Sequence, residues 1–134
     1  MKKIVFIVEK TDTGFSAFAE DFDKIPAATT GETMTELREN ILDAYNSVAE
    51  LHNLPLLNNL EDITIQLDLP QLFDYYKVIN ASALSSRIGM DKTLLSQYVN
   101  GHKKAGPKQV KRILEGIKQL GSELTSLELS LNNN

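Results

Sequence analysis

The chain has 134 residues, of which 42% are hydrophobic and 24% are charged, as is ordinary for a globular protein. It contains no cysteine, which excludes disulfide bonds and thiolate metal sites. No apolar run reaches membrane-spanning length, and the apolar part of the N-terminus, residues 4–8, is too short for a signal peptide. We therefore expect a cytoplasmic protein with no membrane partner.

The net charge of −4 conceals two halves of opposite sign. Residues 1–68 contain 5 Lys and Arg against 13 Asp and Glu, a net charge of −8. Residues 69–134 contain 9 basic and 5 acidic residues, a net charge of +4, and residues 82–118 alone carry +6. This reversal predicts two domains, 1–68 and 69–134, with different partners. A local +6 is the charge expected over a phosphate backbone.

The residue pattern of the first half of the chain predicts strands. Alternating or continuous apolar residues favour strands over 3–10, 15–20 and 27–30, and the turn residues Thr11–Gly14 join the first two into a hairpin. The first strand is apolar on both of its faces, so we expect both faces of the sheet to be covered.

A helix and a further strand follow. Thr33 and Glu36 fit a capping box, which predicts a helix from there to about His52. Residues 63–67 alternate apolar and polar, as in a half-buried strand. The predicted order is β-β-β-α-β, a small sheet with one helix laid across it.

The second half predicts helices only. One helix follows Asp68–Pro70, and another begins at Pro107, a residue suited to the first helical position. The apolar positions of the first are Leu72, Phe73, Tyr76 and Ile79, and those of the last are Val110, Ile113, Leu114, Ile117 and Leu120. Further leucines follow at Leu124, Leu127, Leu129 and Leu131. This surplus predicts a homodimer or higher oligomer in which a partner chain covers the tail, and we expect residues 132–134 to fray.

Two short helices joined by a tight turn are predicted between Asn80 and Lys104. Gly89 interrupts the first apolar stripe, Asp91 is suited to cap the second helix, and Gly101 is suited to end it. The polar face of the second helix and the loop behind it offer side chains that hydrogen-bond base edges or phosphates. These candidate DNA-binding residues are Lys92, Thr93, Ser96, Gln97, Asn100, Lys103 and Lys104.

This segment resembles the helix–turn–helix of the Cro/C1 repressor class over LSSRIGMDKTLLSQYVNG, Leu84 to Gly101. The small residue is Ser85, the turn glycine is Gly89, and Ala81 stands where that class often has a DNA-contacting glutamine. The resemblance implies that the second helix lies in the major groove of double-stranded operator DNA. An ordinary helical hairpin inside a core is the alternative.

Nearly the whole chain resembles the HicB family of antitoxins. In the first half the resemblance rests on GFSAFAEDF at residues 14–22, ATTGET at 28–33 and TMTELRENILDAY at 33–45. It implies an α+β protein with a reduced ribonuclease-H-like first domain without catalytic power, followed by an all-α Cro/C1-type domain. It also implies an antitoxin that blocks a small HicA-like toxin, which cleaves mRNA, and that represses its own promoter.

Glu20, Asp21 and Asp23 lie together after the second strand, and we select them as toxin-binding residues, although a solvated turn explains them equally well. We expect no catalytic residue, metal or cofactor. A nuclease of the ribonuclease-H type needs a carboxylate in the middle of its first strand, and residues 4–8 supply none. A transcription regulator whose first domain senses a small molecule remains the second hypothesis.

Overall fold

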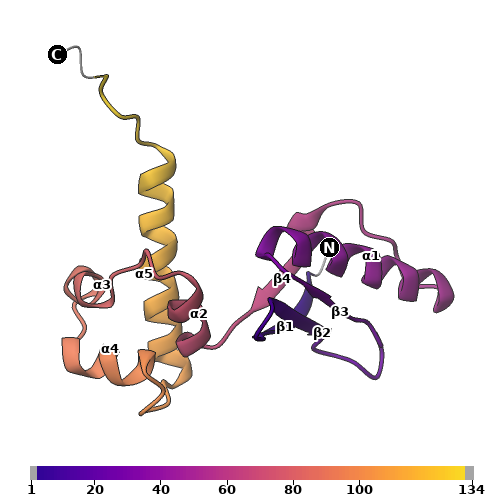
Figure 1. Cartoon of the computed structure of the whole chain (residues 1–134), viewed down its shortest axis with the longest axis horizontal. Coiled ribbons are helices and arrows are strands. Elements are labelled where there is room, and N and C mark those ends of the chain that lie inside the picture. Colours follow the sequence, from indigo (N-terminus) through magenta and orange to yellow (C-terminus); the bar gives the residue numbers. More distant parts are fainter. Residues whose placement is uncertain (1–2, 132–134) are drawn as a thin grey trace. The chain divides into compact units, whose positions relative to one another are not determined.

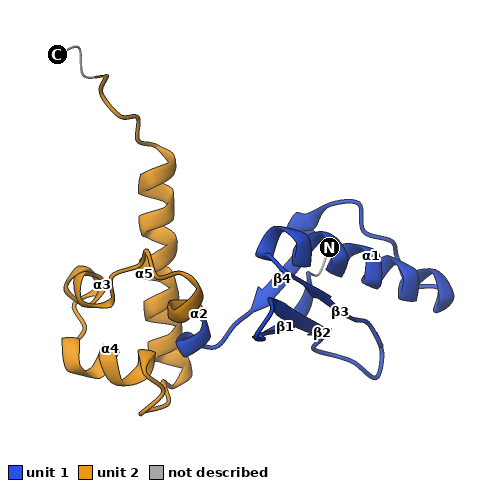
Figure 2. Ribbon diagram, in the orientation of Figure 1, with its two compact units in different colours: residues 1–71 blue, residues 72–134 orange. Residues whose placement is uncertain are grey.

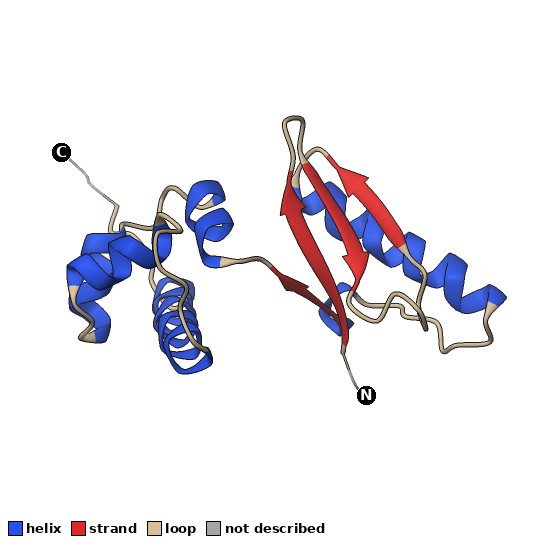
Figure 3. Cartoon of the chain, turned by 90° about the horizontal axis from the view of Figure 1, so that it is seen from below, coloured by secondary structure: helices blue, strands red, loops and turns tan. Residues whose placement is uncertain are grey.

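A computed structural model describes residues 3–131, which form two compact units that divide after residue 71 (Figure 2). The described residues contain a four-stranded mixed sheet and five α-helices (Figures 1 and 3). The predicted α+β class is therefore confirmed. The units divide between Gln71 and Leu72, inside the helix that follows the sheet.

The first unit holds all four strands. Its elements are β1 (Ile4–Lys10), β2 (Phe15–Ala19), β3 (Ala28–Gly31), α1 (Met34–Leu51), a 3₁₀ turn η1 (Leu60–Asp62) and β4 (Ile63–Gln66). The strand order is β3-β2-β1-β4, with β2 antiparallel to both of its neighbours and β4 parallel to β1. The predicted turn closes the hairpin, because the Thr11 N–H donates to the Gly14 carbonyl at 2.8 Å.

Helix α1 covers one face of this sheet (Figure 3). It begins where predicted, since the Thr33 hydroxyl accepts a hydrogen bond from the Glu36 N–H at 3.1 Å. Its apolar stripe meets the side chains that alternate inward from β1 and β2, and burial of these side chains is the main stabilisation of the unit. The buried set is Phe6, Val8, Phe15, Ala17, Ala19, Leu37, Ile41, Tyr45 and Ala49.

Two side chains of α1 fix the loop that leads back to the sheet. The Tyr45 hydroxyl donates to the Pro55 carbonyl at 2.9 Å. The Asn46 amide both donates to the Leu57 carbonyl and accepts from the Leu57 N–H, each at 2.8 Å. These bonds satisfy loop backbone groups that have no strand or helix partner.

The opposite face of the sheet is open within the first unit, so the prediction that both faces are covered is wrong. Phe18 is 36% exposed, and Val5 and Ile7 are only partly buried. Ile7 pairs with Phe18 across β1 and β2, which places these apolar side chains side by side on the open face. The physical reason is that the unit has one long helix, and that helix lies on the other face.

The second unit is helical. Its elements are the end of α2 (Leu69–Tyr75), α3 (Ala81–Ile88), α4 (Lys92–Val99) and α5 (Pro107–Thr125). Its buried apolar side chains are Phe73, Leu84, Met90, Leu95, Tyr98 and Ile113. A Cβ atom on Gly116 would stand 2.3 Å from Ile88 Cγ2, so the absence of a side chain lets α5 pack closely on α3.

Some predicted apolar positions of this half are not in the core. Helix α2 ends at Tyr75, which leaves Tyr76 beyond its end and exposed. Val110 and Leu114 lie on the exposed side of α5. The predicted fraying of residues 132–134 falls outside the described residues. None of the helices within residues 3–131 combines the length and the apolar character that crossing a bilayer requires.

Candidate nucleic-acid interface and acidic sheet end

The turn between α3 and α4 depends on Gly89. This residue has a φ of 67°, in the left-handed region that favours glycine. The next residue, Met90, is buried, and its N–H donates to the Ser85 carbonyl at 2.9 Å. Asp91 then caps α4 as predicted, because its carboxylate accepts from the Leu94 N–H at 3.0 Å. Three residues, Gly89 to Asp91, thus separate α3 from α4, which is the turn length of a helix–turn–helix.

Helix α4 has one buried and one exposed face. Leu95 and Tyr98 point into the core of the second unit. The predicted DNA-binding residues of this helix and its end lie on the other face, and all of them are exposed: Lys92, Thr93, Ser96, Gln97 and Asn100. They carry two kinds of group. The ammonium group of Lys92 is suited to phosphates, and the amides and hydroxyls of the other four residues are suited to base edges.

The loop after α4 brings two further lysines to the same end of the helix. Gly101 has a φ of 76°, and the Gln97 carbonyl accepts from the N–H groups of His102 at 2.9 Å and Lys103 at 3.2 Å. This geometry satisfies the last carbonyls of the helix. Lys103 and Lys104 are both exposed. The seven predicted residues therefore come from one continuous segment of the second unit.

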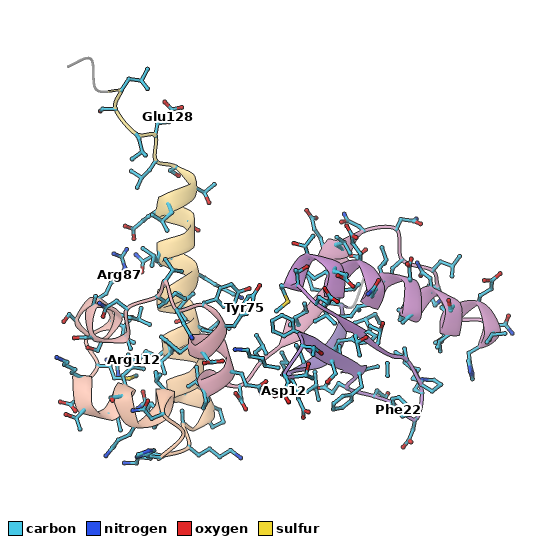
Figure 4. All side chains as sticks on the ribbon, in the orientation of Figure 1. Asp12, Phe22, Tyr75, Arg87, Arg112 and Glu128 are labelled. Atoms are coloured by element: carbon cyan, nitrogen blue, oxygen red, sulfur yellow. The ribbon has the colours of Figure 1, made fainter. Side chains whose placement is uncertain are left out.

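Arg112 supports this interface, and sequence reasoning missed it. The Arg112 side chain extends from α5 (Figure 4). Its guanidinium donates from one Nη2 atom to the Ile88 carbonyl at 3.0 Å and to the Gly89 carbonyl at 2.6 Å. These carbonyls lie at the C-terminus of α3, where helical partners are missing. No local pattern reveals such a contact, because it depends on how α5 packs against α3.

Arg87 contributes less positive charge than the sequence indicates. It forms an ion pair with Glu123, which joins α3 to α5. Both side chains are substantially exposed, so the pair adds little stability, about 0–1 kcal/mol. The carboxylate of Glu123 nevertheless offsets one positive charge of the +6 counted over residues 82–118.

The acidic residues selected in the first unit lie at one end of the sheet. Glu20, Asp21 and Asp23 are all exposed. The backbone turns there, because the N–H groups of Lys24 and Ile25 both donate to the Asp21 carbonyl, at 3.2 and 2.8 Å. Phe22, within the same turn, is 47% exposed (Figure 4). The turn therefore presents carboxylates and an aromatic ring together.

A pocket of about 410 Å³ opens beside this turn. Two of the three selected acidic residues, Glu20 and Asp21, line it, and Asp23 does not. Two lysines, Lys3 and Lys24, line it as well, which the sequence-based selection did not anticipate. The remaining lining residues are Ile4, Val5, Ile25, Tyr45, Leu54 and Pro55. The pocket thus has an apolar wall and charges of both signs.

His52 is the C-cap residue of α1, and His102 is exposed in the loop after α4. Within residues 3–131, no three His, Asp or Glu side chains gather closely enough to hold a metal ion.

No protein-family description matches this chain, and no curated protein matches it either. The resemblances to the Cro/C1 class and to HicB antitoxins therefore rest on the residues quoted above, and what the two surfaces do has to follow from their geometry and charge.

Proposed function

We propose that this chain is the antitoxin of a type II toxin–antitoxin pair. Its first unit neutralises a small HicA-like toxin that cleaves mRNA, and its second unit represses the promoter of the pair by binding operator DNA. The observation that carries the proposal is the exposed polar face of α4, held on a helix–turn–helix whose turn is made by Gly89. The chain itself supplies no catalysis in this account.

The geometry of the second unit supports DNA binding. A recognition helix needs a buried apolar face and an outward face that carries no large apolar side chain, so that it can enter the major groove. In α4 the inward residues are Leu95 and Tyr98, and the outward residues are polar or basic. Lys103 and Lys104 follow at its end, where phosphate contacts fix the position of a recognition helix.

The first unit supports binding of a basic protein. A ribonuclease toxin has to approach RNA phosphates and is therefore expected to be basic. Residues 1–68 carry a net charge of −8. The open face of the sheet and the turn beside it add exposed aromatic rings, Phe18 and Phe22, and aromatic side chains are enriched at protein interfaces. Acidic charge next to apolar surface suits a protein partner better than a nucleic acid.

A homodimer completes the proposal. Helix–turn–helix proteins read palindromic operators with two recognition helices, one on each half-site. The exposed leucines at the end of α5 and beyond, such as Leu124 and Leu127, offer apolar surface for a second copy. Truncation after Gly121 is therefore expected to lower the mass measured by sedimentation.

The pocket favours a second candidate function, a transcription regulator whose first unit senses a small molecule. Its apolar wall and its mixed charges, Glu20 and Asp21 beside Lys3 and Lys24, suit a small zwitterionic compound. In that account the same α4 face binds DNA, but no toxin exists. The two functions share the second unit and differ in the first.

A separation-of-function experiment on the full chain tests the proposal. The small protein encoded by the adjacent reading frame is expressed with the chain, and growth and promoter binding are measured. A Lys92→Ala/Gln97→Ala/Asn100→Ala variant should lose promoter binding and still rescue growth. A Glu20→Gln/Asp21→Asn/Asp23→Asn variant should keep promoter binding and rescue growth less well.

The matched control for the second variant is Glu39→Gln/Asp43→Asn/Glu50→Gln, which removes the same charge from exposed positions of α1. It should behave like the native chain in both assays. If the neighbouring protein is harmless when expressed alone, the antitoxin proposal fails and the small-molecule regulator takes its place. If the α4 variant binds the promoter as tightly as the native chain, the assignment of the recognition helix is wrong.

A further inference from the structure

The segment after α5, residues 127–131, is exposed throughout. Helix α5 ends at Thr125, and the Ser126 N–H donates to the carbonyls of Glu123 and Leu124. Beyond it, Leu127, Leu129 and Leu131 are 64, 94 and 90% exposed. In the part of the chain that the structure describes, the backbone groups of residues 128–131 have no backbone hydrogen-bond partner.

The sequence of this segment has the period of a β-strand. Leu127, Leu129 and Leu131 alternate with polar residues, of which Glu128 is labelled in Figure 4. A period of two places all three leucines on one side of a strand, whereas on a helix Leu129 would lie on the side opposite Leu127 and Leu131. The segment therefore has the pattern of an amphipathic strand without a partner strand.

The pattern is complementary to itself. In an antiparallel pair residues directly opposite each other share a face, so leucine has to lie opposite leucine. A two-fold axis through Leu129 places Leu127 opposite Leu131 of the second copy and Glu128 opposite Ser130 of the second copy. A shift of one residue would place leucines opposite polar residues. Centring the pair on Glu128 instead would oppose two like charges.

We propose that residues 127–131 of two copies form a two-stranded antiparallel β-ribbon centred on Leu129. This inference deepens the homodimer part of the proposed function and rests on it. The ribbon supplies hydrogen-bond partners for the backbone of both segments and gathers six leucines on one face. Two-stranded ribbons are stable only when that face is covered. Leu124, 57% exposed at the end of each α5, provides the covering surface.

Single cysteines test the ribbon and its register in the full chain, because the native chain contains none. A residue on the two-fold axis faces its own copy at about 4.5–5.5 Å between Cα atoms, within the range that a disulfide spans. Leu129→Cys should therefore form a disulfide-linked dimer under mild oxidation. Val78→Cys, at a position 89% exposed outside the segment, measures random collision.

The expected result is that Leu129→Cys cross-links on the order of tenfold faster than Val78→Cys, because pairing raises the effective concentration of the two thiols. Leu127→Cys and Leu131→Cys should each cross-link slowly alone and rapidly when mixed. Equal rates for Leu129→Cys and Val78→Cys would overturn the ribbon. Equally fast self-linking at all three leucine positions would indicate a parallel pair and would overturn the antiparallel register.

Promoter binding measured on the same cysteine variants distinguishes a failure of the ribbon from a failure of the proposed function. A chain that binds the promoter without cross-linking at Leu129 retains its DNA-binding function and lacks the ribbon. A chain that cross-links as expected and binds no promoter retains the ribbon, and the DNA-binding part of the proposed function fails.

Discussion

The two units expose opposite kinds of surface. The first unit places carboxylates next to exposed aromatic rings, as at Asp21 and Phe22, on a sheet with one open face. The outward face of α4 in the second unit carries polar and basic side chains without a large apolar one. Removal of apolar surface from water by a partner lowers the free energy of the complex. A polar, basic surface is instead suited to binding a hydrated polyanion. The contrast therefore favours a protein partner for one unit and DNA for the other.

The largest expected effect is on stability, and it tests whether the cores of the two units unfold independently. Leu95→Ala should reduce the free energy of unfolding of the second unit by about 2–5 kcal/mol, because Leu95 is fully buried and the change leaves a cavity. Hydrogen exchange measured by mass spectrometry should show lost protection in residues 72–131 and not in α1. Leu56→Ala, at an exposed position of the first unit, is the control. Equal loss of protection in α1 would mean that the units unfold as one.

The second effect concerns base recognition by α4. Gln97→Ala should relax the preference at one base position and cost about 1–3 kcal/mol of binding free energy on the native operator. Fluorescence anisotropy titrations on operators with single base changes measure this loss.

Lys103→Ala provides the contrast, since a phosphate contact should weaken all DNA sequences alike and reduce the salt dependence by about one unit of slope. Lys77→Ala, exposed and outside the basic stretch, should change neither property. An equal loss on every operator for Gln97→Ala would place Gln97 on the phosphates instead of the bases.

The third effect concerns the support of the interface. Arg112→Ala removes donors from the carbonyls of Ile88 and Gly89, and should lower the unfolding free energy of the second unit by about 0.5–1.5 kcal/mol. Urea denaturation followed by circular dichroism measures this change. Lys111→Ala, an exposed neighbour on α5, is the control. An unchanged stability for Arg112→Ala would show that solvent satisfies those carbonyls as well.

The smallest effect concerns the acidic turn. Glu20→Gln/Asp21→Asn/Asp23→Asn should slow association with a basic protein partner by roughly threefold to tenfold at low salt, and the difference should shrink as salt rises. Stopped-flow or surface plasmon resonance measures the association rate. The α1 triple variant used above changes the same charge elsewhere. If both triple variants slow association equally, net charge attracts the partner and the turn has no special role.

Local signals in the sequence predicted most of the elements. Thr33, Asp91 and Pro107 mark helix starts through their own side chains or ring, so the neighbouring residues suffice to locate them. The polar face of α4 could be predicted for the same reason, since helical spacing alone separates it from Leu95 and Tyr98.

What depends on packing could not be predicted. The open sheet face arises because one helix covers only one side, a fact that the apolar residues Val5 and Ile7 do not reveal. The contact of Arg112 with the α3 terminus and the lysines of the pocket depend on segments that lie far apart in sequence. Periodicity describes one element at a time and carries no information about such neighbours.

The parallel pairing of β1 with β4 determines when the first unit can fold during synthesis. Ile4 pairs with Ile63, so the sheet lacks an edge strand until the ribosome has released residues up to Gln66. Pairings between such distant residues form slowly, whereas contacts within the helical unit are mostly local and form fast. The unit proposed to neutralise the toxin is nevertheless translated first, so all four of its strands leave the ribosome before α4 and α5 do. An interrupted translation product that extends past β4 would therefore contain all strands of the unit proposed to bind a toxin and lack the helices proposed to bind DNA.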